Sequence, residues 1–451
     1  MPTLPAQVQI EEGLEKYIDS IKQETGSKIL IPYRDWEGSK KTQIEYKIPL
    51  GACLYRLDNG RIKTKTLSHE KKEGKFINLS SKEVQDEIEK FLESSDPRQN
   101  EVLKKRLYKD GQKESAVITA DGFLINGNRR KLALQRLYEK HGDEKFNYIN
   151  VVILPGTNSP ERPTITDIAL LETRYQFQEQ GKSEYTGMDQ ALMMRAHVDS
   201  GIQLNTLLRD DPVYGDLNPR EFEAKINKFR KDYFKPLELM DEYLKVHNLE
   251  GDYVSVEDRW LSFQELYQKI ISKLEEDKFR DQKKIEKYEA GLIQSAAFNL
   301  IRLREDRDNL TGRRTELIRN IFEWLNVSKK DFLAIGKIED SHDSITDADA
   351  RDDAWQEKEG KEVLNIVKKL KNISEQKKDQ AGPITRLEEA LRNLNHEELN
   401  IDTINRSPIP NLDKAFDLTK EIENVNNGLK SAFYNQIKII KSFKEDPNKK
   451  K

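Results

Sequence analysis

The sequence predicts an α+β protein, in which a small domain of mixed strands and helices is followed by a mostly α-helical region. Strand-like and helix-like patterns alternate between residues 42 and 154, whereas strand signals all but disappear from Thr164 onward. Charged residues make up 35% of the 451-residue chain and hydrophobic residues only 36%. This balance favours helices with one buried face each, together with a smaller well-packed unit, over one large core.

Composition also excludes several classes of protein. The 77 Lys and Arg nearly balance the 80 Asp and Glu, for a net charge of -3, which excludes a uniformly basic nucleic-acid coat. The single cysteine, Cys53, excludes a disulfide framework, and the six histidines are too scattered to predict a zinc enzyme. Because the sequence has no signal-peptide pattern and no stretch near ~18 apolar residues, we expect a cytoplasmic protein without a membrane partner.

The first part of the chain supplies the predicted strands. Apolar residues at helical spacing over residues 10–25 predict a helix that ends at Gly26. Alternating Ile44, Tyr46 and Ile48 predict a strand within residues 42–57, and Asn59-Gly60 predicts a tight turn after it. The remaining patterns predict helices over 80–95, 96–110 and 129–142, with strands over 116–119, 123–125 and 148–154.

The second part of the chain is predicted to be helical. Helical periodicity covers residues 164–179, 187–200, 219–246, 259–305, 310–326, 361–376, 382–396 and 411–445. Residues 337–360 are acidic and poor in apolar side chains, and they are interpreted as a flexible linker. The predicted organisation is an N-terminal helical arm (1–40), a mixed domain (41–160), an all-helical middle domain (161–335), an acidic linker (336–360) and a helical C-terminal segment (361–451).

One turn carries the clearest chemical signal. Gly122 and Gly127 permit positive φ and a close backbone approach. The segment Asn126-Gly127-Asn128 directly precedes a helix, whose first amide groups and dipole form an anion site. Arg129 and Arg130 occupy the first turn, the unfavourable end of a helix for cations, so either a bound polyphosphate or simple solvation accounts for them.

The strand, the turn and Gly127-Asn-Arg-Arg-Lys-Leu-Ala-Leu-Gln-Arg-Leu resemble the GERR-type box of the ParB-like family. Ile48-Pro-Leu with Tyr55-Arg-Leu-Asp-Asn-Gly-Arg-Ile looks like the family's first nucleotide-facing box, and Leu171-Glu-Thr-Arg-Tyr-Gln-Phe resembles its ENLQR box. The resemblance covers roughly residues 42–250 and implies a ParB/sulfiredoxin-like fold for the mixed domain. That superfamily includes CTP-binding segregation proteins, sulfiredoxins and small-molecule kinases, so the fold does not determine the chemistry.

The resemblance implies a site for a nucleoside triphosphate, CTP or ATP, with Mg²⁺. Its nucleotide-binding residues would be Asn59, Arg61, Gly122, Asn126, Gly127, Asn128, Arg129, Arg130 and Arg174, and Glu172 would support the metal. Asn128 stands where the family usually has Glu, and Thr173 stands at the asparagine of the ENLQR box. Because the arginine box lacks a cysteine, sulfiredoxin chemistry is excluded. A kinase would need an acidic residue near the first box, and Glu45 and Asp58 are the candidates.

Basic residues suggest DNA as a second partner. Between Arg98 and Lys140, eleven Lys and Arg face five Asp and Glu, a local charge of +6 that includes Lys104, Lys105 and Arg106. Residues 187–235 suit a helix-turn-helix, with Lys225, Lys228, Arg230 and Lys231 on one face of its last helix. The same pattern is typical of an ordinary bundle helix.

The sequence therefore predicts a CTP- or ATP-dependent switch associated with DNA, with slow nucleotide hydrolysis as a further expectation. Two alternatives stay open: a ParB-like nuclease, and a non-catalytic adaptor of a mobile-element or phage-defence system. The long helical C-terminal half is expected to form a homo-oligomer.

Overall fold

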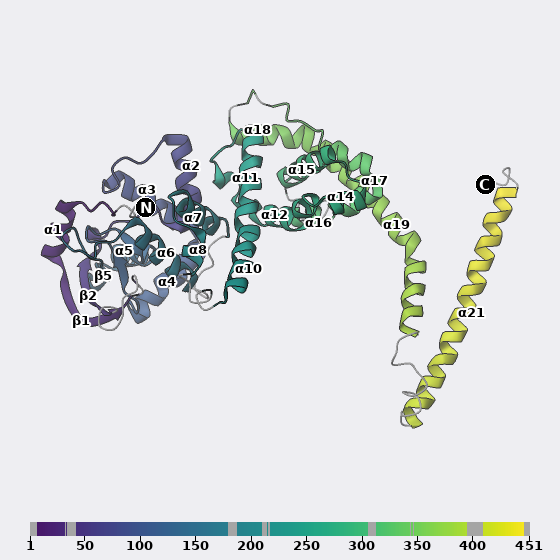
Figure 1. Cartoon of the computed structure of the whole chain (residues 1–451), viewed down its shortest axis with the longest axis horizontal. Coiled ribbons are helices and arrows are strands. Elements are labelled where there is room, and N and C mark those ends of the chain that lie inside the picture. The colour runs from purple at the N-terminus through teal and green to yellow at the C-terminus, as the bar shows by residue number, and fades with distance from the viewer. Residues whose placement is uncertain are drawn as a thin grey trace. The chain divides into compact units, whose positions relative to one another are not determined.

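The fold is α+β, as the sequence predicts: a small mixed sheet near the N-terminus precedes a helical region (Figure 1). The computed structural model describes residues 7–31, 33, 42–178, 187–209, 214, 217–304, 313–342, 344–345, 347–394 and 409–445. Residues 1–371 form one compact unit and residues 372–451 form a second.

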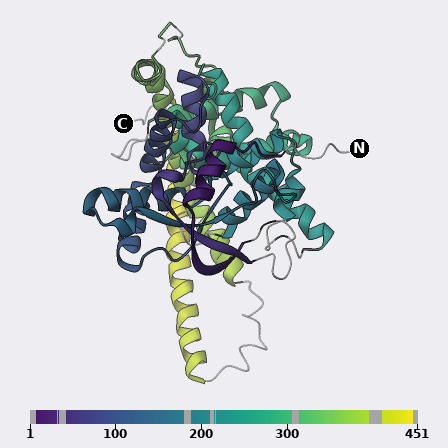
Figure 2. The ribbon, with the colours of Figure 1, turned by 90° about the vertical axis from the view of Figure 1, so that its left-hand side faces the viewer.

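The sheet has five strands in the order β1-β2-β5-β3-β4. The strands are β1 (Gln23–Leu30), β2 (Thr42–Pro49), β3 (Ala116–Ile118), β4 (Leu124–Asn126) and β5 (Tyr148–Ile153). All neighbours pair antiparallel except β3 and β5, which run parallel with Val117 opposite Val152. Figure 2 views the molecule from the side of β1 and β2, the purple strands nearest the reader.

Alternate residues of the central strands enter two different cores. Ala116, Ile118 and Val151 pack on one face with helices α3 (Lys82–Ser95) and α5 (Asn128–His141). Val117 and Val152 pack on the opposite face with helix α6 (Ile165–Gln178). Because strand side chains alternate between faces, each short strand contributes to both layers. The sheet is therefore held between helices, and its ends are fixed relative to α5 and α6.

The N-terminal arm is not wholly helical, which corrects the prediction for residues 1–40. Helix α1 is Glu12–Ile21, and the backbone turns extended at Lys22 to form edge strand β1. Gly26, expected to end the helix, has φ +81° and lies where the β1–β2 register shifts. Backbone pairing with β2 creates this strand, because most side chains of β1 are exposed and carry no alternating pattern.

A helix that the sequence analysis missed follows Asn59. The Asn59 side chain accepts a hydrogen bond from the Arg61 amide (3.0 Å) and caps a short 3₁₀ helix, Gly60–Ile62, that continues into α2 (Lys63–Glu73). Helix α2 then contacts the helical region: the Ser68 hydroxyl accepts from the Val254 amide (3.1 Å), and Lys72 pairs with Asp252 (3.2 Å). The mixed sheet and the helices after it are thus joined within the first unit.

The helical region is built from short helices around one large core and one smaller core. Its elements are α7 (Gly187–Asp199), α8 (Leu204–Arg209), α10 (Pro219–Phe229), α11 (Lys235–Val246), α12 (Trp260–Glu265), α13 (Ser272–Leu274), α14 (Asp277–Lys283), α15 (Lys287–Arg302), α16 (Arg314–Arg319), α17 (Ile321–Ile335) and α18 (Ala348–Trp355). Short π-helical segments at Arg230–Phe234, Leu266–Ile271 and Gln356–Gly360 join several of them. Helices α7, α8 and α10 contribute to the smaller core, and Phe263, Trp324 and Trp355 are among the fully buried side chains of the large one.

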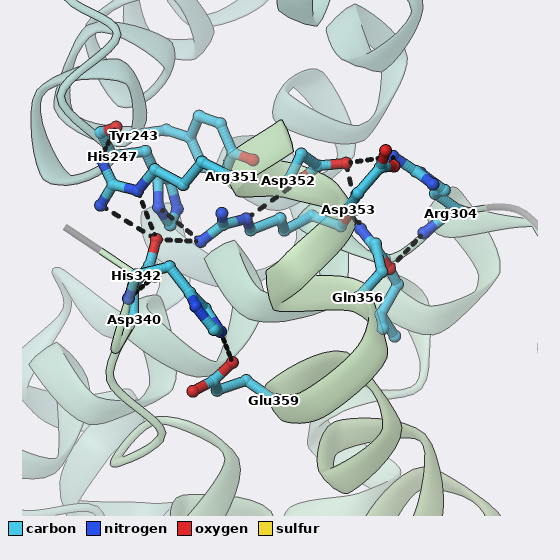
Figure 3. A network of polar contacts seen from close by, with 12 residues as sticks. Tyr243, His247, Arg304, Asp340, His342, Arg351, Asp352, Asp353, Gln356 and Glu359 are labelled. Atoms are coloured by element: carbon cyan, nitrogen blue, oxygen red, sulfur yellow. Dashed lines mark hydrogen bonds and ion pairs between the residues drawn. The ribbon is translucent and has the colours of Figure 1, made fainter. Parts of the chain in front are cut away.

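Residues 337–360 were predicted to be a flexible linker, and this prediction is wrong for the described residues. Helix α18 and the π-helical segment after it bury Arg351, Trp355 and Glu359. The Arg302 guanidinium contacts Asp340 (2.8 Å) and Asp352 (3.3 Å). Figure 3 shows this network, in which Asp340 also accepts from Arg351 and His342 pairs with Glu359. Charge partners on distant helices order the segment, so its polar composition misled the sequence analysis.

The second unit contains the C-terminal part of α19 (Lys361–Leu394) and all of α21 (Ile409–Glu445). Helix α19 runs without interruption where two helices, 361–376 and 382–396, were expected. None of the described helices has both the length and the apolar composition that a bilayer crossing requires.

Candidate functional site

An open pocket of about 570 Å³ lies where α4 (Pro97–Asp110), α5, α6 and the Asn59 loop meet. The predicted nucleotide-binding residues are prominent in its lining. The lining residues are Asn59, Gly60, Arg61, Gln99, Val102, Leu103, Arg106, Leu107, Asp110, Gly111, Lys113, Glu114, Ile125, Asn126, Gly127, Asn128, Arg129, Arg130, Glu172 and Tyr175. Segments that are distant in the sequence therefore converge on one cavity.

The N-terminus of α5 opens on the pocket through a glycine turn. Gly127 is the N-cap, with φ +87° and ψ 8°, and no side chain caps the helix among the described residues. A Cβ atom at this position would lie 2.7 Å from the Cβ of Ala116 and would clash. Only glycine fits both the backbone conformation and the close packing on β3. The first amides of a 14-residue helix thereby face the cavity, together with the positive end of its dipole.

The two arginines of the first turn are held in place from α4 and from the β3 entry. The Arg129 Nε donates to the side-chain oxygen of Asn100 (2.7 Å), and Arg130 pairs with Glu114 (3.2 Å). Tyr175 lies near Arg130, and burial raises the pKa of its hydroxyl to about 12 although Arg130 opposes the shift. Both guanidinium groups are therefore positioned before any ligand arrives, which lowers the entropic cost of gripping an anion.

Three asparagines that line the pocket have different hydrogen-bonding roles. Asn126 lines the pocket, but its side-chain oxygen accepts from the Val117 amide (2.7 Å) and so braces β3 against β4. Asn59 caps the 3₁₀ helix and holds Arg61 at the rim. Asn128 is only 6% exposed, and its Oδ1 has no hydrogen-bond partner among the described residues. An unsatisfied buried oxygen beside an open cavity is suited to a donor from a ligand or water.

Glu172 forms the acidic floor of the pocket. It is 4% exposed, and its Oε1 pairs with Arg56 (3.2 Å). Burial raises the pKa of Glu172 to about 7, and Arg56 partly opposes this shift. His197 on α7 places its Nε2 3.8 Å from Oε2 of Glu172, and burial lowers the pKa of His197 to about 4, so the imidazole is neutral near pH 7.

Glu172 is the one predicted metal ligand, and its chemistry is compatible with that role. Its Oε2 is buried and has no hydrogen-bond partner among the described residues. A carboxylate oxygen is a suitable ligand for Mg²⁺, which commonly takes one or two carboxylates and completes its shell with phosphates and water. The described part of the chain contains no cluster of three or more His, Cys, Asp or Glu residues placed to hold a metal. A cation here would depend on the phosphates of a bound nucleotide.

Not every predicted residue reaches the pocket. Gly122 instead turns the chain beside α1 and the short 3₁₀ helix Leu50–Ala52, where a Cβ atom would lie 2.6 Å from the carbonyl oxygen of Ala52. Arg174, although it lies on α6, is not a lining residue, and neither are Lys104 and Lys105. Lys104 pairs with Glu101 on the surface of α4. Packing alone is therefore sufficient to explain Gly122.

The structure also shows where Glu45 and Asp58, the two candidate catalytic residues of a kinase, lie. Glu45 is buried outside the pocket and accepts hydrogen bonds from the hydroxyls of Thr25 and Ser115. The exposed carboxylate of Asp58 pairs with Lys63 (3.1 Å). Both carboxylates therefore have local partners, and neither lines the cavity.

Comparison with protein-family models, curated proteins and solved structures found no match.

The sequence analysis did not predict that α4 forms a wall of the pocket. Val102, Leu103 and Leu107 of α4 contribute apolar side chains to the lining of the cavity. Five cationic residues (Arg61, Arg106, Lys113, Arg129 and Arg130) line the pocket against three acidic ones (Asp110, Glu114 and Glu172). The amphipathic pattern of residues 96–110 was interpreted only as a basic surface. The apolar residues along one side of this helix were the signal that could have revealed a pocket wall.

The predicted DNA-binding helix presents a basic face. Phe222, Ile226 and Phe229 of α10 are buried in a core shared with α7 and α8. The opposite side exposes Lys225, Lys228, Arg230 and Lys231. This core also contains Ala169 of α6, so the helix that carries Glu172 packs against the same bundle. Arrangement and charge are compatible with a nucleic-acid surface, and also with an ordinary solvated helix.

Proposed function

We propose that the pocket binds a nucleoside triphosphate with Mg²⁺, CTP and ATP being the candidates, and that this binding regulates association with DNA. One observation carries the proposal. The glycine turn with its Arg129–Arg130 pair and the buried carboxylate of Glu172 come from two separate segments and line one cavity of about 570 Å³ at a helix N-terminus. Phosphate groups need clustered amide and guanidinium donors, and a nucleoside also needs an apolar surface.

In this proposal, each side of the cavity would bind a different part of the nucleotide. The α5 amides with Arg129 and Arg130 would hold the phosphates, and Arg61 would close the rim. The apolar side chains of α4 would cover the nucleoside. Bound Mg²⁺ would neutralise phosphate charge, with Glu172 as its protein ligand. Preorganised arginines favour binding because Asn100 and Glu114 already restrain them.

Helix α6 offers a physical route from the nucleotide to DNA. It lines the pocket with Glu172 and Tyr175, and it contributes Ala169 to the core under the basic face of α10. A ligand that shifts α6 by a small amount would therefore also displace α7, α8 and α10. This coupling is proposed together with the nucleotide site, and DNA binding measured with and without nucleotide tests it directly.

The decisive test is calorimetric titration of the full chain with CTP, ATP, GTP and UTP, each with and without Mg²⁺. We expect one of them to bind, and Arg130→Ala to weaken it by about 10-fold or more, because a charge-assisted contact to phosphate is lost. Lys140→Ala is the matched control, since Lys140 is an exposed cation at the far end of the same helix. Released phosphate, measured over hours, tests for slow hydrolysis.

Two results would contradict the proposal. Absence of binding by all four nucleotides, with DNA present or absent, would leave the non-catalytic adaptor as the better interpretation. Equal loss of affinity in Arg130→Ala and Lys140→Ala would mean that general charge, and not the pocket, attracts the nucleotide.

A further inference from the structure

Helix α21, the yellow helix of Figure 1, exposes an unusual amount of apolar surface. Ten of its large hydrophobic side chains are 40–68% exposed: Phe416, Leu418, Ile422, Val425, Leu429, Phe433, Tyr434, Ile437, Ile439 and Ile440. Isolated helices depend on packing of an apolar face for most of their stability in water. The 37 residues of α21 therefore need a partner for this face.

Seven of these side chains form one seam along the helix, at positions 418, 422, 425, 429, 433, 437 and 440. The steps are three or four residues, and the seam runs for roughly 33 Å at 1.5 Å per residue. Leu418, Leu429 and Ile440 recur at an interval of 11 residues, as do Ile422 and Phe433. Because an 11-residue repeat closely matches the α-helical period, the seam stays on one side and can pack along a second helix.

Charge along α21 identifies the partner. Residues 409–427 carry four acidic and two basic side chains, a net charge of -2, and residues 428–445 carry four basic and one acidic, a net charge of +3. An antiparallel copy of the same helix places each acidic half against a basic half, whereas a parallel copy juxtaposes like charges. The described C-terminal part of α19, residues 372–394, has four acidic and four basic residues and offers no such complement.

We propose that α21 pairs with α21 of a second copy of this chain, antiparallel and with a two-fold axis near Asn427. This interface is independent of the proposed nucleotide site. Full overlap of the helices sets the axis near residue 427, the middle of Ile409–Glu445. Glu423 and Lys430 lie on the same flank of the seam, because seven residues span about two turns. They are equidistant from an axis that passes between Asn426 and Asn427, so Glu423 of each copy faces Lys430 of the other.

The first test is sedimentation equilibrium of the full chain from low to high micromolar concentration. We expect a species of twice the 52.6 kDa chain mass. Leu429→Glu should weaken dimerisation by about 100-fold or more, because it buries unpaired charge at the centre of the seam. Tyr434→Glu is the matched control, since Tyr434 lies off the seam and is 68% exposed. Both sites are solvent-exposed in the monomer, so neither substitution endangers the fold of residues 1–371.

A charge swap tests the orientation. Lys430→Glu should weaken the dimer by about 3-fold to 10-fold, because Glu423 then faces another carboxylate, and Glu423→Lys with Lys430→Glu should restore it. In a parallel pair each residue faces its own copy, so a single swap would have little effect. A monomer at all concentrations, a dimer that survives Leu429→Glu, or a dimer indifferent to the swap would each overturn the proposal.

Discussion

The turn before α5 is most sharply tested by replacing Gly127 with alanine. The substitution adds only one methyl group, but at a position where the backbone has φ +87° and the new Cβ would lie 2.7 Å from the Cβ of Ala116. Two separate penalties follow. A non-glycine residue in the left-handed region costs roughly 1–2 kcal/mol, and overpacking against a buried neighbour costs roughly 1–3 kcal/mol more. We therefore expect Gly127→Ala to reduce the free energy of unfolding by roughly 2–5 kcal/mol.

Gly142 at the other end of the same helix is the matched control. It also has a left-handed backbone, with φ +64°, but a Cβ atom there would meet nothing within 4 Å. Gly142→Ala should therefore incur only the conformational penalty, roughly 1–2 kcal/mol. Both substitutions reduce the entropy of the unfolded chain equally, so that contribution cancels in the comparison.

Urea unfolding followed by circular dichroism measures both variants, and nucleotide titration shows whether the α5 amides have moved. We expect the larger loss of stability, and weaker nucleotide binding, in Gly127→Ala alone. Equal losses in the two variants would refute the reasoning, because they would show that the close approach of Gly127 to β3 contributes nothing beyond backbone strain.

Three further predictions concern other parts of the molecule. Arg302→Met should reduce the free energy of unfolding by roughly 1–3 kcal/mol, because the partly buried Asp340 and Asp352 each lose one charged hydrogen-bond donor, whereas Arg319→Met, at a solvent-exposed ion pair, should have little effect in the same urea assay. Because burial raises the pKa of Glu172 from 4.5 to about 7, its stabilising effect is complete below pH 4.5 and is lost as the pH rises through 7. Glu172→Gln should remove up to about 3 kcal/mol of that pH dependence, and an unchanged pH profile of thermal unfolding would count against it. Lys225→Ala with Lys228→Ala should lower DNA affinity and flatten the log–log salt dependence by about two; an unchanged slope in filter binding would exclude α10 from the interface.

Local patterns made much of the candidate site predictable. The turn at Gly127 and the helix after it follow from glycine, asparagine and apolar spacing within about 15 residues, and the structure has both. The short strands β3 and β5 were also recognisable, because their apolar runs are bounded by turn residues. Such signals need no knowledge of the rest of the chain, since backbone conformation and helix periodicity are decided by near neighbours.

Features made by distant partners were not predictable in this way. Edge strand β1 exists because β2 offers unpaired backbone groups, although its own side chains are mostly exposed. The α4 wall faces the pocket only because α5 packs against it. His197 reaches Glu172 from another helix, and no spacing in the sequence relates the two.

The sequence by itself determined the α+β class, the glycine turn with its arginine pair, and the amphipathic seam of α21, because each depends on the identity and spacing of nearby residues. Only the tertiary structure decided that Gly122 serves packing, that Arg129 and Glu172 share a cavity, and that residues 337–360 are ordered. Long-range contacts bring together groups whose separation in the chain carries no signal. Burial then alters what those groups can do, as the raised pKa of Glu172 illustrates.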